Sequence, residues 1–284
     1  MKPFKQISEL VALLEGRGLL LDRPDGAAFL HDFNYYRFTG YSRQFQRNPK
    51  NGQNEYQSGT KLTEISSVIE VDAELRRLLG EALTFVELSV RARFAHEAGQ
   101  VFGGHGFYLD PSSYFDFTPD LDRLLATMRN DLARSKSPTV ARYAHEDRYD
   151  NVPIWVAVEV LSFGAIAKML MYLANDVPAR EVAASYSMAW EGFQSTIHAF
   201  SVLRNQCAHH GQIWHRKPSI QTPVPRKLRP RDVKYDHQGT YPAIIMLKRY
   251  MAEIRPGRMW AAEVDTLLES NHLLRNGILE PFAK

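Results

Sequence analysis

The chain has 284 residues, of which 44% are hydrophobic and 24% are charged, proportions that are ordinary for a globular protein. The formal net charge of +3 is too small to indicate a nucleic-acid partner without local clustering. The single cysteine, Cys207, excludes an internal disulfide framework and a cysteine-based zinc site. Because Cys207 lies among apolar residues, we interpret it as a small buried side chain rather than a nucleophile.

No segment of the chain predicts a secretory or membrane location. Residues 1–5 lack the long apolar stretch of a signal peptide. No apolar run reaches the ~18 residues that a membrane span needs. The nearest candidate, 154–173, is interrupted by Glu159 and Lys168. We therefore expect a soluble, cytoplasmic protein without a membrane partner.

The first sixty residues predict a helical segment that ends in a polar loop. Apolar residues at helical spacing predict one helix over 7–14, and a second helix starts near residue 24. The aromatic residues of 35–41 are expected to pack against both helices. Arg37 and Arg43 lie beside them, and in an alternative interpretation these arginines contact phosphates while the rings stack on bases. Because 47–61 is polar, we expect a loop there and a boundary between an N-terminal segment, 1–60, and a main domain, 61–284.

An apolar pattern over 63–102 predicts one or two helices, with Thr63 as the N-cap. Glu87 and Arg91 are four residues apart, in the order that favours an ion pair on a helix. Because Glu87 lies between apolar neighbours, its carboxylate is expected to be partly buried and to need a cation. Arg91 or a residue of the helix predicted over 188–208 could supply that cation. Glu87 is therefore either a structural partner or a support for a functional site.

The middle of the chain predicts further helices over 119–134, 138–149 and 153–173, a short one after Pro178, and one over 188–208. The 153–173 segment is strongly apolar, and we expect it to form the centre of a bundle. Glu159 interrupts its apolar pattern. Two roles for this carboxylate stay open, a salt bridge in the core or the orientation of Arg204.

The end of the 188–208 helix carries the clearest chemistry, in Arg204, Asn205, His209 and His210. Histidine transfers protons near neutral pH, and the planar arginine fork suits a phosphate. On a continuous helix Arg204 and His209 lie ~140° apart around the axis and ~7.5 Å apart along it, whereas Asn205 and His209 share a face. We expect Gly211 to be the C′ residue, which places both imidazoles at a helix C-terminus. The alternative is that these side chains only cap the helix.

After the histidines the chain becomes basic and rich in proline. Residues 216–234, which we call the basic strap, contain four prolines that prevent a helix and one acid, Asp232. The basic residues of the strap are Arg216, Lys217, Arg226, Lys227, Arg229, Arg231 and Lys234. We favour an RNA-backbone contact through the strap, with Arg216, Lys217, Arg226 and Lys227 foremost, over a merely solvated loop.

Two amphipathic helices, over 241–254 and 259–268, close the main domain, and residues 273–284 either pack or extend. Strand alternation and a glycine-rich phosphate loop are both missing from the sequence. The predicted fold class is therefore all-α, a helical bundle with short flanking helices.

Five short segments, spread along the chain between residues 33 and 216, resemble the Abi-like (abortive infection D/F type) family of bacterial proteins. They are residues 204–210 with 213–216, the aromatic segment 33–41, the helix 85–93, and residues 153–164. The family belongs to the HEPN superfamily. The resemblance implies a HEPN-type helical bundle, here with extra N-terminal and C-terminal helices.

The resemblance also implies a metal-independent endoribonuclease without a cofactor. In this chemistry the RNA 2′-OH attacks its own 3′-phosphate and leaves a 2′,3′-cyclic phosphate and a 5′-OH. His209 would transfer a proton, Arg204 would neutralise charge on the phosphate, and Asn205 would hold the imidazole or a phosphate oxygen. HEPN nucleases generally build this site across a dimer. We therefore expect a homodimer in which the Arg204 helices face each other, unless His210 is the second proton-transfer group.

The implied biological role is growth arrest or abortive infection by RNA cleavage, restrained by an antitoxin that can be a small non-coding RNA. No DNA partner is expected. One alternative is a non-catalytic HEPN-type RNA-binding protein, in which Arg204 and His209 are only phosphate contacts. A second is a metal protein built on His209, His210 and His215, although adjacent helical histidines point ~100° apart. A third is a protein-interaction module without affinity for RNA.

Overall fold

The computed structural model describes residues 4–146, 148–255 and 258–281. Within these ranges the chain forms thirteen α-helices and a single two-stranded sheet, which confirms the predicted all-α class. The same ranges contain no helix with both the length and the apolar character that crossing a bilayer requires. Residues 1–3, on which the expectation about a signal peptide partly depends, and 282–284 of the tail lie outside the described residues.

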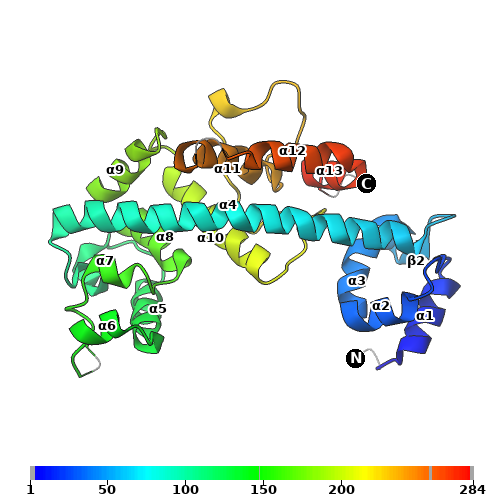
Figure 1. Cartoon of the computed structure of the whole chain (residues 1–284), viewed down its shortest axis with the longest axis horizontal. Coiled ribbons are helices and arrows are strands. Elements are labelled where there is room, and N and C mark those ends of the chain that lie inside the picture. The colour runs from blue at the N-terminus through cyan, green and yellow to red at the C-terminus, as the bar shows by residue number, and fades with distance from the viewer. Residues whose placement is uncertain (1–3, 147, 256–257, 282–284) are drawn as a thin grey trace.

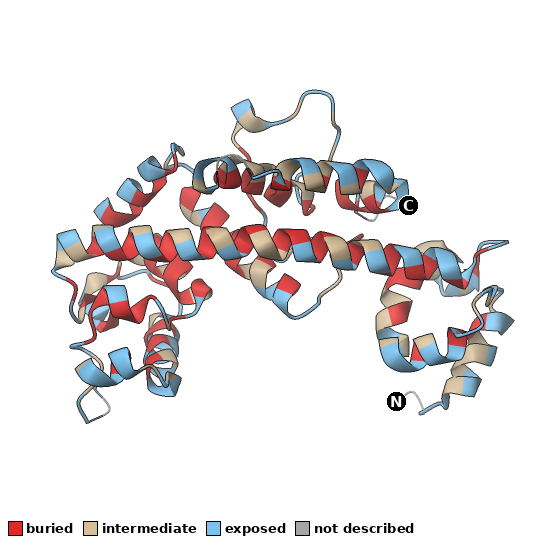
Figure 2. Ribbon diagram, in the orientation of Figure 1, coloured by how far each residue is buried: buried red, intermediate tan, exposed pale blue. Residues whose placement is uncertain are grey.

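The centre of the fold is one helix of 41 residues, α4 (Leu62–Phe102), which runs through the molecule as a spine (Figure 1). Proline is missing from this segment, and it ends at Gly103, which adopts the left-handed conformation that suits glycine. At ~1.5 Å per residue, α4 is about 60 Å long. Helices α3, α7 and α9–α13 all contact it, and buried residues recur along its length (Figure 2).

The prediction that residues 153–173 form the central helix is wrong. This segment forms two short helices, α7 (Ile154–Ala157) and α8 (Phe163–Tyr172). The Ser162 hydroxyl caps α8 by accepting a hydrogen bond from the Ala165 N–H, so a new helix begins there. Glu159 lies exposed in the turn between the two helices, and the structure shows neither of the roles suggested for it.

The other main-body helices pack along α4 or against its neighbours (Figure 1). They are α5 (Leu121–Arg134), α6 (Pro138–Tyr143), α9 (Val177–Ser185), α10 (Phe193–Ala208), α11 (Tyr241–Ile254), α12 (Trp260–Ser270) and α13 (His272–Leu279), with short 3-10 helices at Phe107–Leu109, Pro111–Ser113 and Arg226–Leu228. The tail therefore packs as α13, since Leu274 and Ile278 are buried in the core.

The N-terminal residues gather at one end of α4 (Figure 1). They form α1 (Ile7–Gly16), α2 (Gly26–Phe33) and α3 (Tyr35–Ser42), the 3-10 helices Arg43–Phe45 and Pro49–Asn51, and the strands β1 (Gln46–Asn48) and β2 (Gln53–Tyr56). The predicted loop over 47–61 thus contains a small antiparallel hairpin. Its strands are polar, so no apolar alternation marked them in the sequence. The buried rings of Phe38 and Tyr41 confirm the predicted aromatic core.

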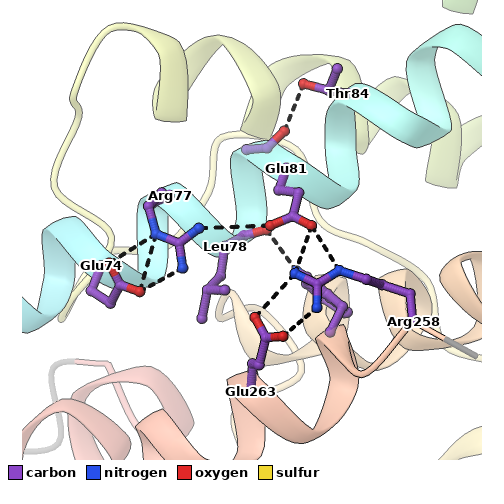
Figure 3. Close-up of polar contacts among 9 residues, drawn as sticks. Glu74, Arg77, Leu78, Glu81, Thr84, Arg258 and Glu263 are labelled. Carbon is purple, nitrogen blue, oxygen red and sulfur yellow. Dashed lines mark hydrogen bonds and ion pairs between the residues drawn. The ribbon is translucent and has the colours of Figure 1, made fainter.

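Two contacts attach other elements to α4. Thr63 is not the N-cap, because α4 begins one residue earlier; the Asp22 carboxylate instead accepts hydrogen bonds from the Thr63 N–H and hydroxyl. At the start of α12, the Trp260 indole N–H donates to the Leu78 carbonyl at 2.7 Å. Beside it Arg258 lies between Glu81 and Glu263, as Figure 3 shows. Because this arginine is exposed, we assign the attachment of α12 to the buried Trp260 rather than to the ion pairs.

Candidate functional site

The helix α10 presents the predicted catalytic residues at its C-terminal end. It begins at Phe193, after Gly192 with a φ of +85°, so the first five residues of the predicted helix lie in the turn before it. His209 is the C-cap and His210 is the C′ residue, with a φ of +55°. The Gly211 N–H donates to the Gln206 carbonyl at 2.8 Å, and the His210 N–H donates to the Cys207 carbonyl at 3.1 Å.

These two bonds form a Schellman motif that ends the helix. The expectation that Gly211 is C′ is wrong by one residue, and His210 takes the left-handed position that glycine usually fills. A non-glycine residue in this conformation is strained. His209, His210 and Asn205 are all exposed, so the structure brings the two imidazoles to the surface together. Cys207 is buried as predicted, and burial raises the pKa of its thiol to about 12.

Arg204 is held by a carboxylate of α4. Its Nε lies 2.9 Å from Oε2 of Glu87, and its Nη1 lies 3.4 Å from Oδ1 of the neighbouring Asn205. Glu87 is only 6% exposed, whereas the Arg204 side chain is 42% exposed. A buried carboxylate therefore fixes the direction of a guanidinium whose remaining surface faces outward.

Glu87 also pairs with Arg91, one turn further along α4. The buried Arg91 guanidinium donates to the carbonyls of Val158 and Leu161, the latter at 2.7 Å, in the turn between α7 and α8. Both cations considered for Glu87 from the sequence are thus its partners. The structural pair and the site support are one arrangement, because the same carboxylate joins Arg91 to Arg204.

A second acid of α4 holds the loop that follows the histidines. Asp72 is completely buried and accepts hydrogen bonds from the Trp214 N–H at 2.8 Å and the Ile213 N–H at 3.4 Å. It also pairs with Arg76 and accepts a hydrogen bond from the Tyr41 hydroxyl. Burial and the adjacent carboxylate raise the pKa of Tyr41, so the phenol remains a donor.

The sequence reasoning missed Asp72. The available signal was the spacing of Asp72 and Arg76, an acid and an arginine four residues apart among apolar residues, as in Glu87 and Arg91. Together the two pairs attach both ends of the 204–214 segment to one helix.

Arg37 of α3 reaches the site from the N-terminal segment. Its Nη2 donates to the His210 carbonyl, and its guanidinium lies over the Phe33 ring at 5.1 Å. The Gln212 amide adds bonds to the carbonyls of Gly40 and Trp214. Arg37 therefore supports the strained His210 position, and its suggested contact with RNA stays a prediction.

The other basic residues predicted to bind RNA occupy two places. Arg43 and Arg216 line a common groove beside α3, described below. Lys217 pairs with Asp236 at 2.8 Å. The exposed Arg226 and Lys227 lie on the part of the strap that Figure 1 shows beyond α11, on the opposite side of α4 from the C-terminal end of α10. The structure thus brings Arg43 and Arg216 together and separates Arg226 and Lys227 from the histidines.

Among the residues that the structure describes, no three histidine, cysteine, aspartate or glutamate side chains gather closely enough to hold a metal ion. His209 occupies the C-cap position and His210 the C′ position of the Schellman motif, and His215 follows the buried Trp214. The end of α10 exposes two imidazoles, which can transfer protons near neutral pH, and one turn earlier carries a guanidinium that Glu87 orients.

Similarity to known proteins is found at the level of a protein family. No curated protein and no solved structure matches the chain. The family model described as "Abi-like protein" matches residues 28–215, from α2 to just beyond the histidine loop, which is well over half of the chain. The matched region contains Arg37, both acid–arginine pairs of α4 and the end of α10. The chain therefore belongs to the Abi-like protein family, and this membership connects it with abortive infection.

Proposed function

We propose that this protein is a metal-independent endoribonuclease that acts as the toxin of a bacterial abortive-infection system. The observation that carries the proposal is the pairing of Arg204 with the buried Glu87 at the same helix end that exposes His209 and His210. A guanidinium fixed by a buried carboxylate is oriented before a substrate arrives, which is what stabilisation of a developing charge requires. The HEPN superfamily placement, implied by the resemblance, is part of the same proposal.

The chemistry follows from the groups at the end of α10. An imidazole of His209 takes the proton of the RNA 2′-OH, and that oxygen attacks the adjacent phosphorus. Arg204 neutralises the charge that develops on the phosphate oxygens, and Asn205, which contacts Arg204, holds a phosphate oxygen or an imidazole. A protonated imidazole then donates to the leaving 5′-oxygen. The products are a 2′,3′-cyclic phosphate and a 5′-OH.

Two proton movers are needed, and each chain offers His209 and His210 at one helix end. In our proposal a two-fold homodimer brings two Arg204–His209 sets together. The exposure of both imidazoles at the C-terminal end of α10 supports this arrangement, because an exposed helix end is accessible to a second copy. The single-chain alternative uses His210 as the second group.

We further propose that an antitoxin restrains the nuclease until infection, and that a small non-coding RNA is the first candidate. The basic side chains of the strap, together with Arg37 and Arg43, support an RNA partner, since phosphate contacts dominate affinity for nucleic acids. Purification of the native protein in mild salt, followed by sequencing of any bound nucleic acid, tests this step. A defined small RNA supports it, and a protein partner in its place contradicts it.

The nuclease proposal is tested with total RNA in the presence of EDTA. Wild-type protein is expected to cleave and His209→Ala to be inactive, while His31→Ala, which removes an exposed histidine of α2, cleaves normally. Products should carry 2′,3′-cyclic phosphate and 5′-OH ends. Cleavage that survives in His209→Ala/His210→Ala refutes the mechanism. RNA binding by a wild-type protein that never cleaves supports the non-catalytic alternative instead.

A further inference from the structure

A groove of about 700 Å³ runs between the N-terminal segment and the loop that follows the histidines. One wall comes from α3 and the hairpin region, and the other comes from His215 and Arg216. The lining residues are Tyr36, Thr39, Gly40, Arg43, Gln44, Gln46, Arg47, Asn48, Pro49, Lys50, His215 and Arg216. The volume lies in the range of ligand-binding clefts.

The groove is strongly cationic. Arg43, Arg47, Lys50 and Arg216 line it, and its described lining includes no carboxylate. Four positive charges in one groove exceed the formal net charge of +3 of the whole chain. Such a concentration favours a polyanion, because field lines converge in a cleft with walls of one sign.

The remaining lining residues indicate which polyanion. Tyr36 is 67% exposed, and its ring contacts Tyr35 edge-on, with the ring centroids 5.7 Å apart. The amides of Gln44 and Asn48 lie in the same groove. An aromatic face and side-chain amides fit unpaired bases, which stack on rings and hydrogen-bond through their edges, whereas duplex RNA keeps its bases stacked inside. We propose that this groove binds a single-stranded segment of the RNA substrate, with phosphates on the four cations and a base on Tyr36.

The groove is connected to the candidate catalytic residues through α3. Arg37 of α3, which donates to the His210 carbonyl, is six residues before Arg43, which directly follows α3 and lines the groove; at α-helical rise this is about 9 Å. The side chain of Gln212, two residues after His210, donates a hydrogen bond to the carbonyl of Gly40, which lines the groove. RNA seated in the groove therefore leads toward the histidines. The inference rests on the proposed nuclease function, which the groove would supply with substrate.

The test is fluorescence anisotropy with a labelled twelve-nucleotide single-stranded RNA, in a His209→Ala background that keeps the probe intact. Arg47→Ala/Lys50→Ala removes two groove cations that are exposed on the hairpin. Arg134→Ala/Lys136→Ala, at the end of α5, is the matched control with the same loss of charge. Each phosphate contact on a single strand contributes about −0.7 to the slope of log K against log salt. The groove variant should weaken binding and reduce the slope by about 1.4, while the control keeps both; unchanged binding in the groove variant overturns the inference.

Substitutions of Tyr36 test the stacking of a base separately from the contribution of the groove cations. Tyr36→Ala should weaken binding of the single strand about tenfold, and Tyr36→Phe, which keeps the ring, should restore it. A duplex of the same length should bind more weakly than the single strand and should be indifferent to Tyr36→Ala. Equal affinity for both probes, or equal loss in Tyr36→Ala and Tyr36→Phe, refutes a single-stranded site.

Cleavage kinetics distinguish failure of this inference from failure of the proposed function. With wild-type His209, Arg47→Ala/Lys50→Ala should raise KM and leave kcat near the wild-type value. If the wild type cleaves RNA and the groove variant has the same KM, the groove inference fails alone. If the wild type never cleaves but the groove variant loses affinity, the nuclease proposal fails and the binding site stands.

Discussion

The substitution Glu87→Gln separates the two roles of one buried carboxylate. The glutamine keeps the size of the side chain and removes the charge shared by Arg91 and Arg204. Arg91 is then a buried cation without a counter-charge, although its bonds to the turn between α7 and α8 remain. Arg204 loses the partner that directs its guanidinium. We therefore expect losses of stability and of cleavage that have different causes.

The expected magnitudes follow from burial. Removing one partner of a buried ion pair costs about 3–5 kcal/mol, and the lower value applies here because the amide oxygen still accepts a hydrogen bond. With an unfolding entropy of ~2.1 cal/mol/K per residue, 284 residues give ~0.6 kcal/mol/K, so about 3 kcal/mol lowers Tm by about 5 °C. Arg204→Ala removes a side chain that is 42% exposed and should cost only about 1 kcal/mol, or about 2 °C.

Thermal unfolding followed by circular dichroism measures the first effect. Glu74→Gln is the control, because it removes an exposed carboxylate that pairs with Arg77 on the same helix and should leave Tm unchanged. For the second effect, kcat/KM is measured for Glu87→Gln, for Arg204→Ala and for the double variant. If Glu87 acts on cleavage through Arg204, the double variant is no slower than Arg204→Ala. A wild-type Tm for Glu87→Gln, or additive losses of kcat/KM, would refute the reasoning.

Three further predictions concern the histidine loop and its neighbours. Asp72→Asn should lower the free energy of unfolding, measured by urea titration, by about 3 kcal/mol, because the buried network loses its negative charge. It should also release the Trp214 segment, which is seen as a change in tryptophan fluorescence. Wild-type values of both the free energy of unfolding and the fluorescence would contradict this. His210→Gly should raise Tm by relieving the positive φ, and retained cleavage assigns proton transfer to His209, whereas lost cleavage assigns part of it to His210. The Cys207 thiol should resist a thiol reagent at pH 8 until the protein is unfolded. Rapid labelling of the folded protein would contradict this. Because folding raises the pKa of the thiol from 9.0 to about 12, this group should leave the free energy of unfolding independent of pH below pH 9 and should lower it as the pH rises from 9 toward 12.

The parts of the site that could be predicted depend on local spacing. The position of Arg204 and the histidines at the end of a helix followed from apolar periodicity, and the need of Glu87 for a cation followed from its apolar neighbours. The second partner could be narrowed only to a residue of the 188–208 helix and not to Arg204 itself, because a contact across 117 positions is not encoded in the local pattern. Asp72 was missed for the same reason, since its partners Tyr41 and Trp214 are distant in sequence.

The errors in the fold have identifiable causes. Continuous hydrophobicity across 153–173 concealed the break at Ser162, where a hydroxyl starts a new helix although the apolar pattern continues. The β1–β2 hairpin was concealed because its strands are only three and four residues long and almost entirely polar, so they carry no apolar alternation to detect. Gly211 was favoured as C′ on glycine's usual preference, and the support that Arg37 gives to His210 could not be read from the sequence.

The spacing of the two acids on α4 constrains how this segment can vary. Asp72 and Glu87 are fifteen residues apart, which on an α-helix is four turns and about 60°, so both face the same side of the helix. One holds the loop after the histidines, and the other holds Arg204. Substitutions between them that preserve the helix leave this relation intact. A single inserted or deleted residue would rotate one acid by about 100° relative to the other, so the length of the interval is under stricter constraint than its residue identities.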